Sequence, residues 1–177
     1  MGGWAGPMGA TSAGLLLYRI SPGRVVEVLI AHPGGPFWAR KDEAAWSIPK
    51  GEYGADEDPL DAAYREFEEE VGLPVPDGET IFLGERRQPG GKRVRAWALE
   101  ADLDVTNASS NTFELEWPRG SGRVREFPEV DRVEWVPADV ARRKLLKGQV
   151  PFLDELTGAV PAAGGRSEEG TQGLPGL

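Results

Sequence analysis

Apolar residues are grouped along the first part of the chain in a pattern that predicts a β-hairpin. Residues 12–20 and 25–32 are rich in Leu, Val and Ile, and a Ser-Pro-Gly turn separates the two segments. Short apolar runs bounded by turn residues are typical of β-strands. We therefore expect two strands that could pair with each other, followed by a Pro-Gly-Gly-Pro loop.

Further runs of apolar and β-branched residues follow after residue 79. They predict strands over residues 80–87, 92–102, 112–117 and 132–136. Helical periodicity near the end of the chain predicts two short helices, over residues 137–146 and 152–156. Strands interleaved with only a few helices indicate an α/β fold, in which a mixed β-sheet is flanked by helices on both faces.

Residues 59–71 show the strongest helical pattern. Asp58 is suited to cap the first turn, Pro59 fits the first helical position, and Gly72 is suited to end the helix. On a wheel with about 100° per residue, one face is apolar and is expected to meet the core: Leu60, Ala63, Tyr64, Phe67 and Val71. The neighbouring arc is acidic and holds Glu66, Glu69 and Glu70.

The acidic arc is not explained by helix stability. Like charges three or four residues apart destabilise a helix by a few tenths of a kcal/mol per pair. Mg²⁺ and Mn²⁺, in contrast, prefer carboxylate, carbonyl and water oxygens as ligands. The arc therefore indicates a site for Mg²⁺ or Mn²⁺, and the alternative is an ordinary solvated acidic face.

The helix lies within a longer motif that resembles the signature of the Nudix hydrolase family. Gly51 is followed after five residues by Glu57, and after seven more by the run R-E-F-E-E-E-V-G-L at residues 65–73. Residues 51–73 thus match the pattern G-x5-E-x7-R-E-U-x-E-E-x-G-U at every specified position, where U is a bulky aliphatic or similar residue. Many family members have glycine where this chain has Asp56, but Asp tolerates the backbone geometry of such a turn.

The resemblance implies an α/β/α sandwich in which a loop-helix-loop binds metal and activates water for attack on a phosphoryl group. It implies principal metal ligands at Glu69 and Glu70, a further ligand or base at Glu66, and a carbonyl ligand at Gly51. Arg65 and Glu57 would pair and orient this cluster, the alternative being an ordinary surface ion pair. The expected catalytic residues are thus Glu57, Arg65, Glu66, Glu69 and Glu70.

The segment that leads into the motif also has a resemblance. Residues 46–51 are similar to a W-x-x-P-K-G segment of Nudix enzymes that act on dinucleoside polyphosphates and diphosphoinositol phosphates. We expect Lys50 to bind substrate phosphate, together with Trp38, Arg40 and Lys41 of the loop at residues 34–45. The alternatives are that Lys50 is simply solvated and that Trp38, with Phe37, packs the loop onto the body.

A distal acid is expected to complete the metal site. In related Nudix sequences an acid about six residues before a tryptophan such as Trp135 reaches the metal, and Glu129 has this spacing, with Glu126 as the second choice. The alternative is that Glu129 is an ordinary surface carboxylate. Phe113 and Trp117 could contact substrate or the core, and we favour the core. His32, the only histidine, is expected to be structural or solvent-facing rather than a catalytic base.

Composition limits the classes of partner. The net charge of -9 repels a phosphate backbone, so no polymeric nucleic acid is expected as partner, whereas a small phosphorylated substrate is compatible if divalent cations screen it. The chain has no cysteine, which excludes disulfides and thiolate zinc sites. No apolar run is long enough to span a membrane and no signal peptide is evident, so we expect a cytoplasmic protein without a membrane partner.

One folded domain is expected over residues 11–160. A flexible arm is expected before it at residues 1–10, and a flexible tail after it at residues 161–177, because both segments have little to bury. The sequence does not specify an oligomeric state.

The expected function is metal-dependent cleavage of a diphosphate linkage in a nucleoside diphosphate derivative. Dinucleoside polyphosphates and nucleoside triphosphates are favoured over nucleotide sugars and inositol pyrophosphates. Glu66 or Glu69 would complete the removal of a proton from the attacking water. One alternative is a non-catalytic Nudix-fold module or regulator that binds a nucleotide without cleaving it. Another is a structural protein with an acidic helix.

Overall fold

The computed structural model describes residues 10–160. Its elements follow in the order β1 (Thr11–Ile20), β2 (Val26–Pro33), β3 (Lys50–Glu52), α1 (Pro59–Val71), β4 (Thr80–Arg87), β5 (Arg93–Glu100), β6 (Thr112–Glu116), β7 (Val124–Pro128), β8 (Val130–Pro137), α2 (Ala138–Lys144), the 3-10 helix η1 (Lys147–Gln149) and α3 (Val150–Ala159). The arm and tail expected at residues 1–10 and 161–177 lie outside the described residues, except for Ala10.

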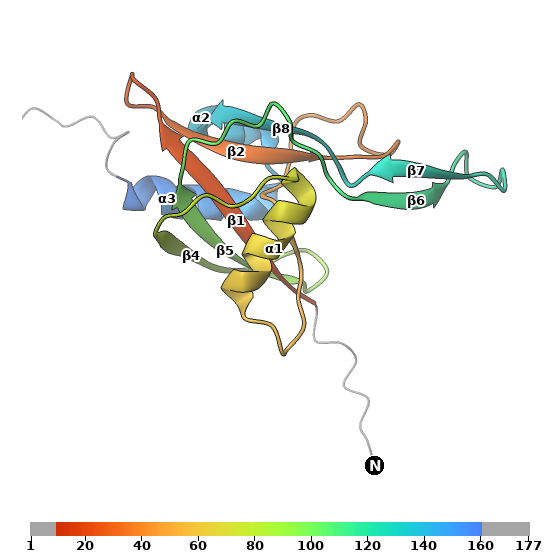
Figure 1. The fold of residues 1–177 in the computed structure, drawn as a ribbon, viewed down its shortest axis with the longest axis horizontal. Coiled ribbons are helices and arrows are strands. Elements are labelled where there is room, and N and C mark those ends of the chain that lie inside the picture. Colours follow the sequence, from red (N-terminus) through yellow and green to blue (C-terminus); the bar gives the residue numbers. More distant parts are fainter. Residues whose placement is uncertain (1–9, 161–177) are drawn as a thin grey trace, which may run out of the picture.

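Six strands form one mixed sheet (Figure 1). The strand order is β4-β5-β1-β2-β8, and β3 pairs with the first residues of β1. β1 and β5 are parallel, whereas the other neighbours in this sheet are antiparallel. The predicted pairing of the first two strands is confirmed, since Tyr18 of β1 lies opposite Val28 of β2.

Helices cover both faces of the sheet, α1 in front and α2 and α3 behind in the view of Figure 1. Successive side chains of a strand point to opposite faces, so Leu15 of β1 shares a core cluster with Phe67 of α1. Leu16, the next residue, shares the other cluster with Phe152 of α3. The expected α/β/α sandwich is therefore confirmed. Among the described helices, none combines the length and the apolarity needed to cross a bilayer.

Helix α1 has the bounds that its sequence predicts. The side chain of Asp58 accepts a hydrogen bond from the backbone N–H of Asp61 at 3.1 Å, which satisfies one of the unpaired donors of the first turn. Gly72 ends the helix in the left-handed conformation, with φ of 73°. One expected core contact is wrong: Ala62 is fully buried, whereas Leu60 is only partly buried, because the buried stripe is turned toward the Ala62 side.

Two strands were not predicted. β3 has only three residues, too few for a visible pattern, and β7 contains the charged residues Arg125 and Glu126. β7 pairs with β6 in a separate two-stranded sheet, and Figure 1 shows this hairpin projecting beyond the six-stranded sheet. The other strands lie where the sequence predicts them, with ends that differ by at most two residues, and α3 extends the predicted segment 152–156 at both ends.

Candidate active site

Arg65 connects the loop of the motif to its helix. Its Nε and Nη2 donate to the two carboxylate oxygens of Glu57, at 2.8 and 3.1 Å. Its Nη1 donates to Glu66 at 2.8 Å and to Glu69 at 3.2 Å. These bonds, that with Glu57 above all, raise the pKa of the guanidinium still further above its usual range. One permanent cation therefore holds three carboxylates, and the expected pairing of Arg65 with Glu57 is present.

Gly51 leaves the space that the carboxylate of Glu66 occupies. Strand β3 places Gly51 opposite Ala13 of β1, at the edge of the sheet that faces α1. A Cβ atom on Gly51 would lie 2.0 Å from Cδ of Glu66 and 2.1 and 2.4 Å from its two oxygens. Any side chain at position 51 would therefore displace the Glu66 carboxylate.

Glu70 is the most strongly perturbed acid of the cluster. Its Oε2 accepts a hydrogen bond from the backbone N–H of Lys50 at 3.1 Å. Burial nevertheless raises the pKa of Glu70 to about 8, and the negative charges of Glu66 and Glu129 act in the same direction. Burial also raises the pKa of Glu66, opposed by its bond with Arg65. Ionisation of both acids therefore costs more free energy here than in water, and a nearby cation would offset that cost.

Glu129 reaches the same region from a distant part of the chain. The backbone N–H of Asn111 donates to the carbonyl of Glu69 at 3.0 Å, and the N–H of Glu129 donates to the carbonyl of Asn111 at 2.8 Å. These bonds fix the β7–β8 junction beside the C-terminal end of α1. The charge of Glu129 contributes to the raised pKa of both Glu66 and Glu70, so its side chain is electrostatically part of the cluster.

Glu126, the second choice for the distal acid, lies elsewhere. It is exposed on β7, and its carboxylate accepts a hydrogen bond from the hydroxyl of Thr112 on β6. Of the two acids, Glu129 is therefore the one that the fold brings to the motif.

The donor set fits a hard divalent cation in its chemistry. Glu66, Glu69, Glu70 and Glu129 supply carboxylate oxygens, and two of these acids carry a raised pKa because burial and concentrated negative charge disfavour their ionised forms. Within residues 10–160 no three acidic or histidine side chains are yet oriented to hold an ion together. Glu66 and Glu69 point to Arg65 instead, so they must turn from the guanidinium to share a cation.

The residues expected to bind substrate lie in different parts of the structure. Lys50 lies beside Glu70, as its backbone bond shows. Trp38 packs against the core cluster on the face of the sheet opposite α1, with Lys41 Nζ 4.9 Å from the centre of its ring. Arg40 is exposed. The structure therefore brings Lys50 to the carboxylates, but places Trp38 and Lys41 on the other side of the sheet.

His32 holds the loop of residues 34–45 in place through its ring nitrogens. The sequence predicts a structural or solvent-facing His32 but not these partners. The ring is fully buried, with Nδ1 2.8 Å from a carboxylate oxygen of Asp131 and Nε2 2.6 Å from the carbonyl oxygen of Lys41. Both ring nitrogens are therefore engaged, which agrees with the expectation that His32 is structural. Asp131, its partner on β8, carried no signal in the sequence.

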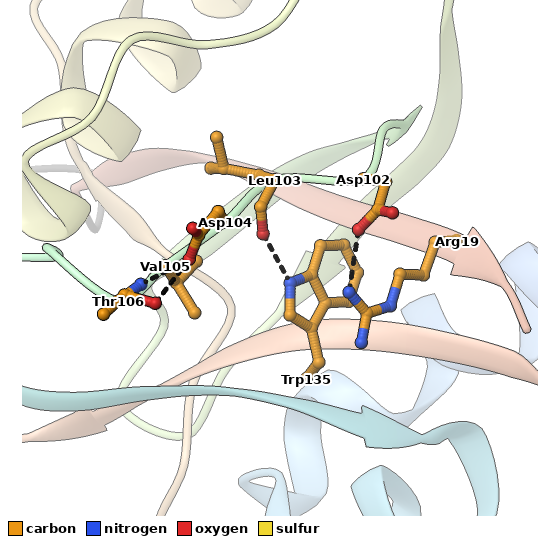
Figure 2. A pocket seen from close by; sticks show the side chains of 7 residues that line it. All are labelled: Arg19, Asp102, Leu103, Asp104, Val105, Thr106 and Trp135. Carbon is orange, nitrogen blue, oxygen red and sulfur yellow. Dashed lines mark hydrogen bonds and ion pairs between the residues drawn. The ribbon is translucent and has the colours of Figure 1, made fainter.

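A hollow of about 430 Å³ lies away from the carboxylates, between β1, β8 and the segment after β5 (Figure 2). The guanidinium of Arg19 lies 4.4 Å from the centre of the Trp135 ring and donates to Asp102 at 2.8 Å. Trp135 Nε1 donates to the carbonyl of Leu103 at 2.9 Å. These contacts join β1 and β8 to the segment after β5.

Comparison with known families identifies the class of protein. The model of the NUDIX domain matches residues 11–156, which is most of the chain. The chain therefore belongs to the Nudix family, and the resemblance seen in residues 51–73 is confirmed.

Individual relatives are similar over parts of their length. The RNA pyrophosphohydrolase of Halorhodospira halophila is 46% identical over 117 residues, which cover 63% of this chain and 64% of that protein. The RNA pyrophosphohydrolase of Hahella chejuensis is 41% identical over 63 residues, which cover 34% of this chain and 38% of that protein. The chain thus spans less than two thirds of either relative.

A solved structure supports the architecture. The C. elegans Ap4A hydrolase binary complex superposes with a TM-score of 0.57 at 20% identity, over 84% of this chain and 96% of that chain. This likeness establishes the α/β/α Nudix fold.

Proposed function

We propose that this protein is a divalent-metal-dependent pyrophosphohydrolase that cleaves a diphosphate linkage in a nucleotide. The observation that carries the proposal is the acidic cluster of α1 within a complete Nudix motif, in which Glu66 lies against Gly51 and the charge of Glu129 acts on both Glu66 and Glu70. A structural protein would have no use for a partly buried cluster of this charge, because each ionised acid destabilises its neighbours.

The metal-binding residues of this proposal are Glu66, Glu69, Glu70, Glu129 and the carbonyl of Gly51. Mg²⁺ or Mn²⁺ held there would lower the pKa of a bound water and neutralise charge on the phosphates. Arg65 holds Glu57 through two hydrogen bonds, which tie the loop before α1 to the helix that carries the metal ligands.

Each remaining group has a defined part in the reaction. A carboxylate oxygen of Glu66 or Glu69 accepts the proton of the attacking water. The water oxygen forms a bond to phosphorus, the P–O bond to the bridging oxygen breaks, and each fragment leaves with a phosphate. Lys50, whose backbone is fixed by Glu70, presents its ammonium to the phosphates as a point charge.

The substrate of this proposal carries a nucleoside 5′-polyphosphate. The W-x-x-P-K-G segment favours dinucleoside polyphosphates, and nucleoside triphosphates offer the same linkage. The relatives named RNA pyrophosphohydrolase add the 5′-triphosphate end of RNA to this set. All three substrates contain the same diphosphate linkage. They differ in the groups attached to that linkage.

A substrate panel with product identification tests the proposal. Purified protein is incubated with Mg²⁺ or Mn²⁺ and diadenosine tetraphosphate, ATP or 5′-triphosphorylated RNA, in water enriched in ¹⁸O. We expect cleavage of at least one substrate, with ¹⁸O in one phosphate-bearing product and no reaction in EDTA. Binding without cleavage across the panel would instead identify a nucleotide-sensing module.

A further inference from the structure

The hairpin of β6 and β7 segregates its side chains into two different faces. Directly opposite residues of an antiparallel pair share a face, and the register places Phe113 opposite Phe127 and Leu115 opposite Arg125. The N–H of Trp117 donates to the carbonyl of Arg123 at 2.9 Å and continues this ladder. We call these six residues the aromatic–arginine face: Phe113, Leu115, Trp117, Arg123, Arg125 and Phe127.

The other face of the hairpin has the opposite character. Glu114 lies opposite Glu126, and Glu116 lies opposite Val124. Three carboxylates are thus on one side of the hairpin and none is on the aromatic–arginine face. For a chain with a net charge of -9, this makes the aromatic–arginine face a local exception.

The aromatic residues of this face do not belong to the body of the protein. Neither of the two core clusters includes Phe113, Trp117 or Phe127. Phe113 packs on Phe127 at 6.0 Å between ring centres, and Trp117 packs edge-to-face on Phe37 of the loop after β2 at 5.4 Å. Phe37 itself remains 54% exposed, whereas Phe113, Trp117 and Phe127 are partly buried, and Phe113 lies against Gly35, where an added Cβ would be 2.9 Å from its ring. The expectation that Phe113 and Trp117 are core residues is therefore wrong.

The arginines of the hairpin have no carboxylate partner. Within residues 10–160, no ion pair joins Arg119, Arg123 or Arg125 to an acid. Arg125 instead lies 6.0 Å from the centre of the Phe127 ring. The exposed ring of Phe37 and the partly accessible rings of the face, beside exposed guanidinium groups without an acidic partner, suit a ligand that carries both flat rings and negative charge.

The face is continuous with the candidate active site. β7 ends at Pro128, so Phe127 lies two residues before Glu129. The N–H of Gly34 donates to the carbonyl of Glu129 at 2.9 Å, which joins the loop bearing Phe37 to the same junction. A nucleotide chain whose phosphate end lies at the carboxylates could therefore continue along the hairpin.

We propose that the aromatic–arginine face binds single-stranded RNA, stacking bases on its rings and pairing phosphates with Arg123 and Arg125. This inference rests on the proposed function for the direction of the RNA, whose 5′ end lies at the carboxylates. The expectation of no polymeric nucleic-acid partner was drawn from the net charge of the whole chain. A net charge does not show that one face carries arginines and no carboxylate.

Binding is measured without catalysis, by fluorescence anisotropy in EDTA. The probe is a 3′-labelled, 5′-triphosphorylated single-stranded RNA of about ten nucleotides. We expect Trp117→Ala to weaken binding by about tenfold, and Trp117→Phe, which keeps a flat ring, to restore most of it. The double variant Arg123→Gln/Arg125→Gln should lower the slope of log K against log salt by about 0.7 for each phosphate that these arginines neutralise in the wild type.

Matched controls come from the same hairpin and the same RNA. The double variant Glu114→Gln/Glu116→Gln changes charge on the opposite face, and we expect its salt slope to equal that of the wild type. Annealing the probe to its complement hides the bases and should weaken binding. Circular dichroism and melting temperature verify that each variant is folded.

The outcomes separate this inference from the proposed function. Equal RNA affinity of wild type, Trp117→Ala and the double arginine variant overturns the inference, even if the enzyme is active. A dimer by sedimentation that Trp117→Ala dissociates, with RNA affinity unchanged, also overturns it and assigns the face to a second copy of the chain. Absence of hydrolysis by the wild type refutes the proposed function and leaves the binding result to decide the inference alone.

An activity measurement in Mg²⁺ adds a second readout. Trp117→Ala should raise KM for triphosphorylated RNA while leaving kcat, and the KM for ATP, near the wild-type values. Loss of activity on ATP by the same factor would contradict a role confined to the RNA chain.

Discussion

Arg65 grips both carboxylate oxygens of Glu57, with Nε at 2.8 Å from one and Nη2 at 3.1 Å from the other. A fork-to-fork bond of this kind needs the planar guanidinium, which lysine lacks. The same side chain bonds to Glu66 and Glu69. The guanidinium of Arg65 therefore links Glu57, which precedes α1, to two acids of the helix.

Arg65→Lys should keep the charge and lose this order. We expect kcat/KM to fall by about 10- to 100-fold, as for residues that orient metal ligands. The free energy of unfolding should change by about 1 kcal/mol or less, since the pair is partly exposed. Arg86→Lys is the control, because Arg86 has similar exposure and pairs with Glu155 at 3.4 Å, away from the motif. An equal loss of kcat/KM in the two variants would contradict an orienting role for Arg65.

Gly51→Ala tests the steric requirement of the motif. The added Cβ would lie 2.0 Å from Cδ of Glu66, and since that atom ends a flexible side chain, the carboxylate should move aside rather than unfold the protein. We expect a large loss of kcat with a melting temperature within a few degrees of the wild type. Gly54→Ala, where nothing lies within 4 Å of an added Cβ, should leave both unchanged. A fully active Gly51→Ala enzyme would contradict the placement of Glu66.

Glu70→Gln removes a charge while keeping the shape of the side chain. We expect hydrolysis to fall by more than about 100-fold, beyond the range for residues that only orient a ligand. Stability in EDTA should be retained, because burial already opposes ionisation of Glu70. Glu68→Gln is the matched control, since Glu68 is exposed on the same helix and lies outside the acidic arc. Wild-type turnover by Glu70→Gln would remove Glu70 from the metal site.

The raised pKa of Glu70 predicts a pH dependence of stability without metal. Its pKa is about 8 in the folded protein against a usual 4.5, so between these values the folded state binds more protons than the unfolded state. The free energy of unfolding should therefore fall as pH rises through this window. In EDTA, the melting temperature of the wild type should fall more between about pH 6 and about pH 8 than that of Glu70→Gln. Parallel pH profiles would show that Glu70 does not titrate in this range.

Local signals explain why the catalytic helix could be predicted from sequence. Asp58, Pro59 and Gly72 act within one turn of their own positions, so the bounds of α1 follow without knowledge of the fold. The acidic arc follows from helical spacing alone. The error at Leu60 arose because the wheel specifies a stripe, while the neighbouring strand decides how the stripe is turned.

Features that depend on distant segments could not be predicted in the same way. β7 carries polar residues and is a strand because β6 pairs with it. The placement of Glu129 depends on bonds through Asn111 to the carbonyl of Glu69, and only the family resemblance suggested it. Trp38 packs against the core cluster on the face of the sheet opposite α1, with the exposed Lys41 beside its ring, a placement that depends on distant segments and that the sequence does not specify.

Crystals soaked in MnCl₂, measured at the manganese absorption edge, test the proposed metal site most directly. We expect an anomalous difference peak bounded by the side chains of Glu66, Glu69 and Glu70 in the wild type, and a weakened peak in Glu70→Gln. No peak among these side chains in the wild type, or an undiminished one in the variant, would contradict it.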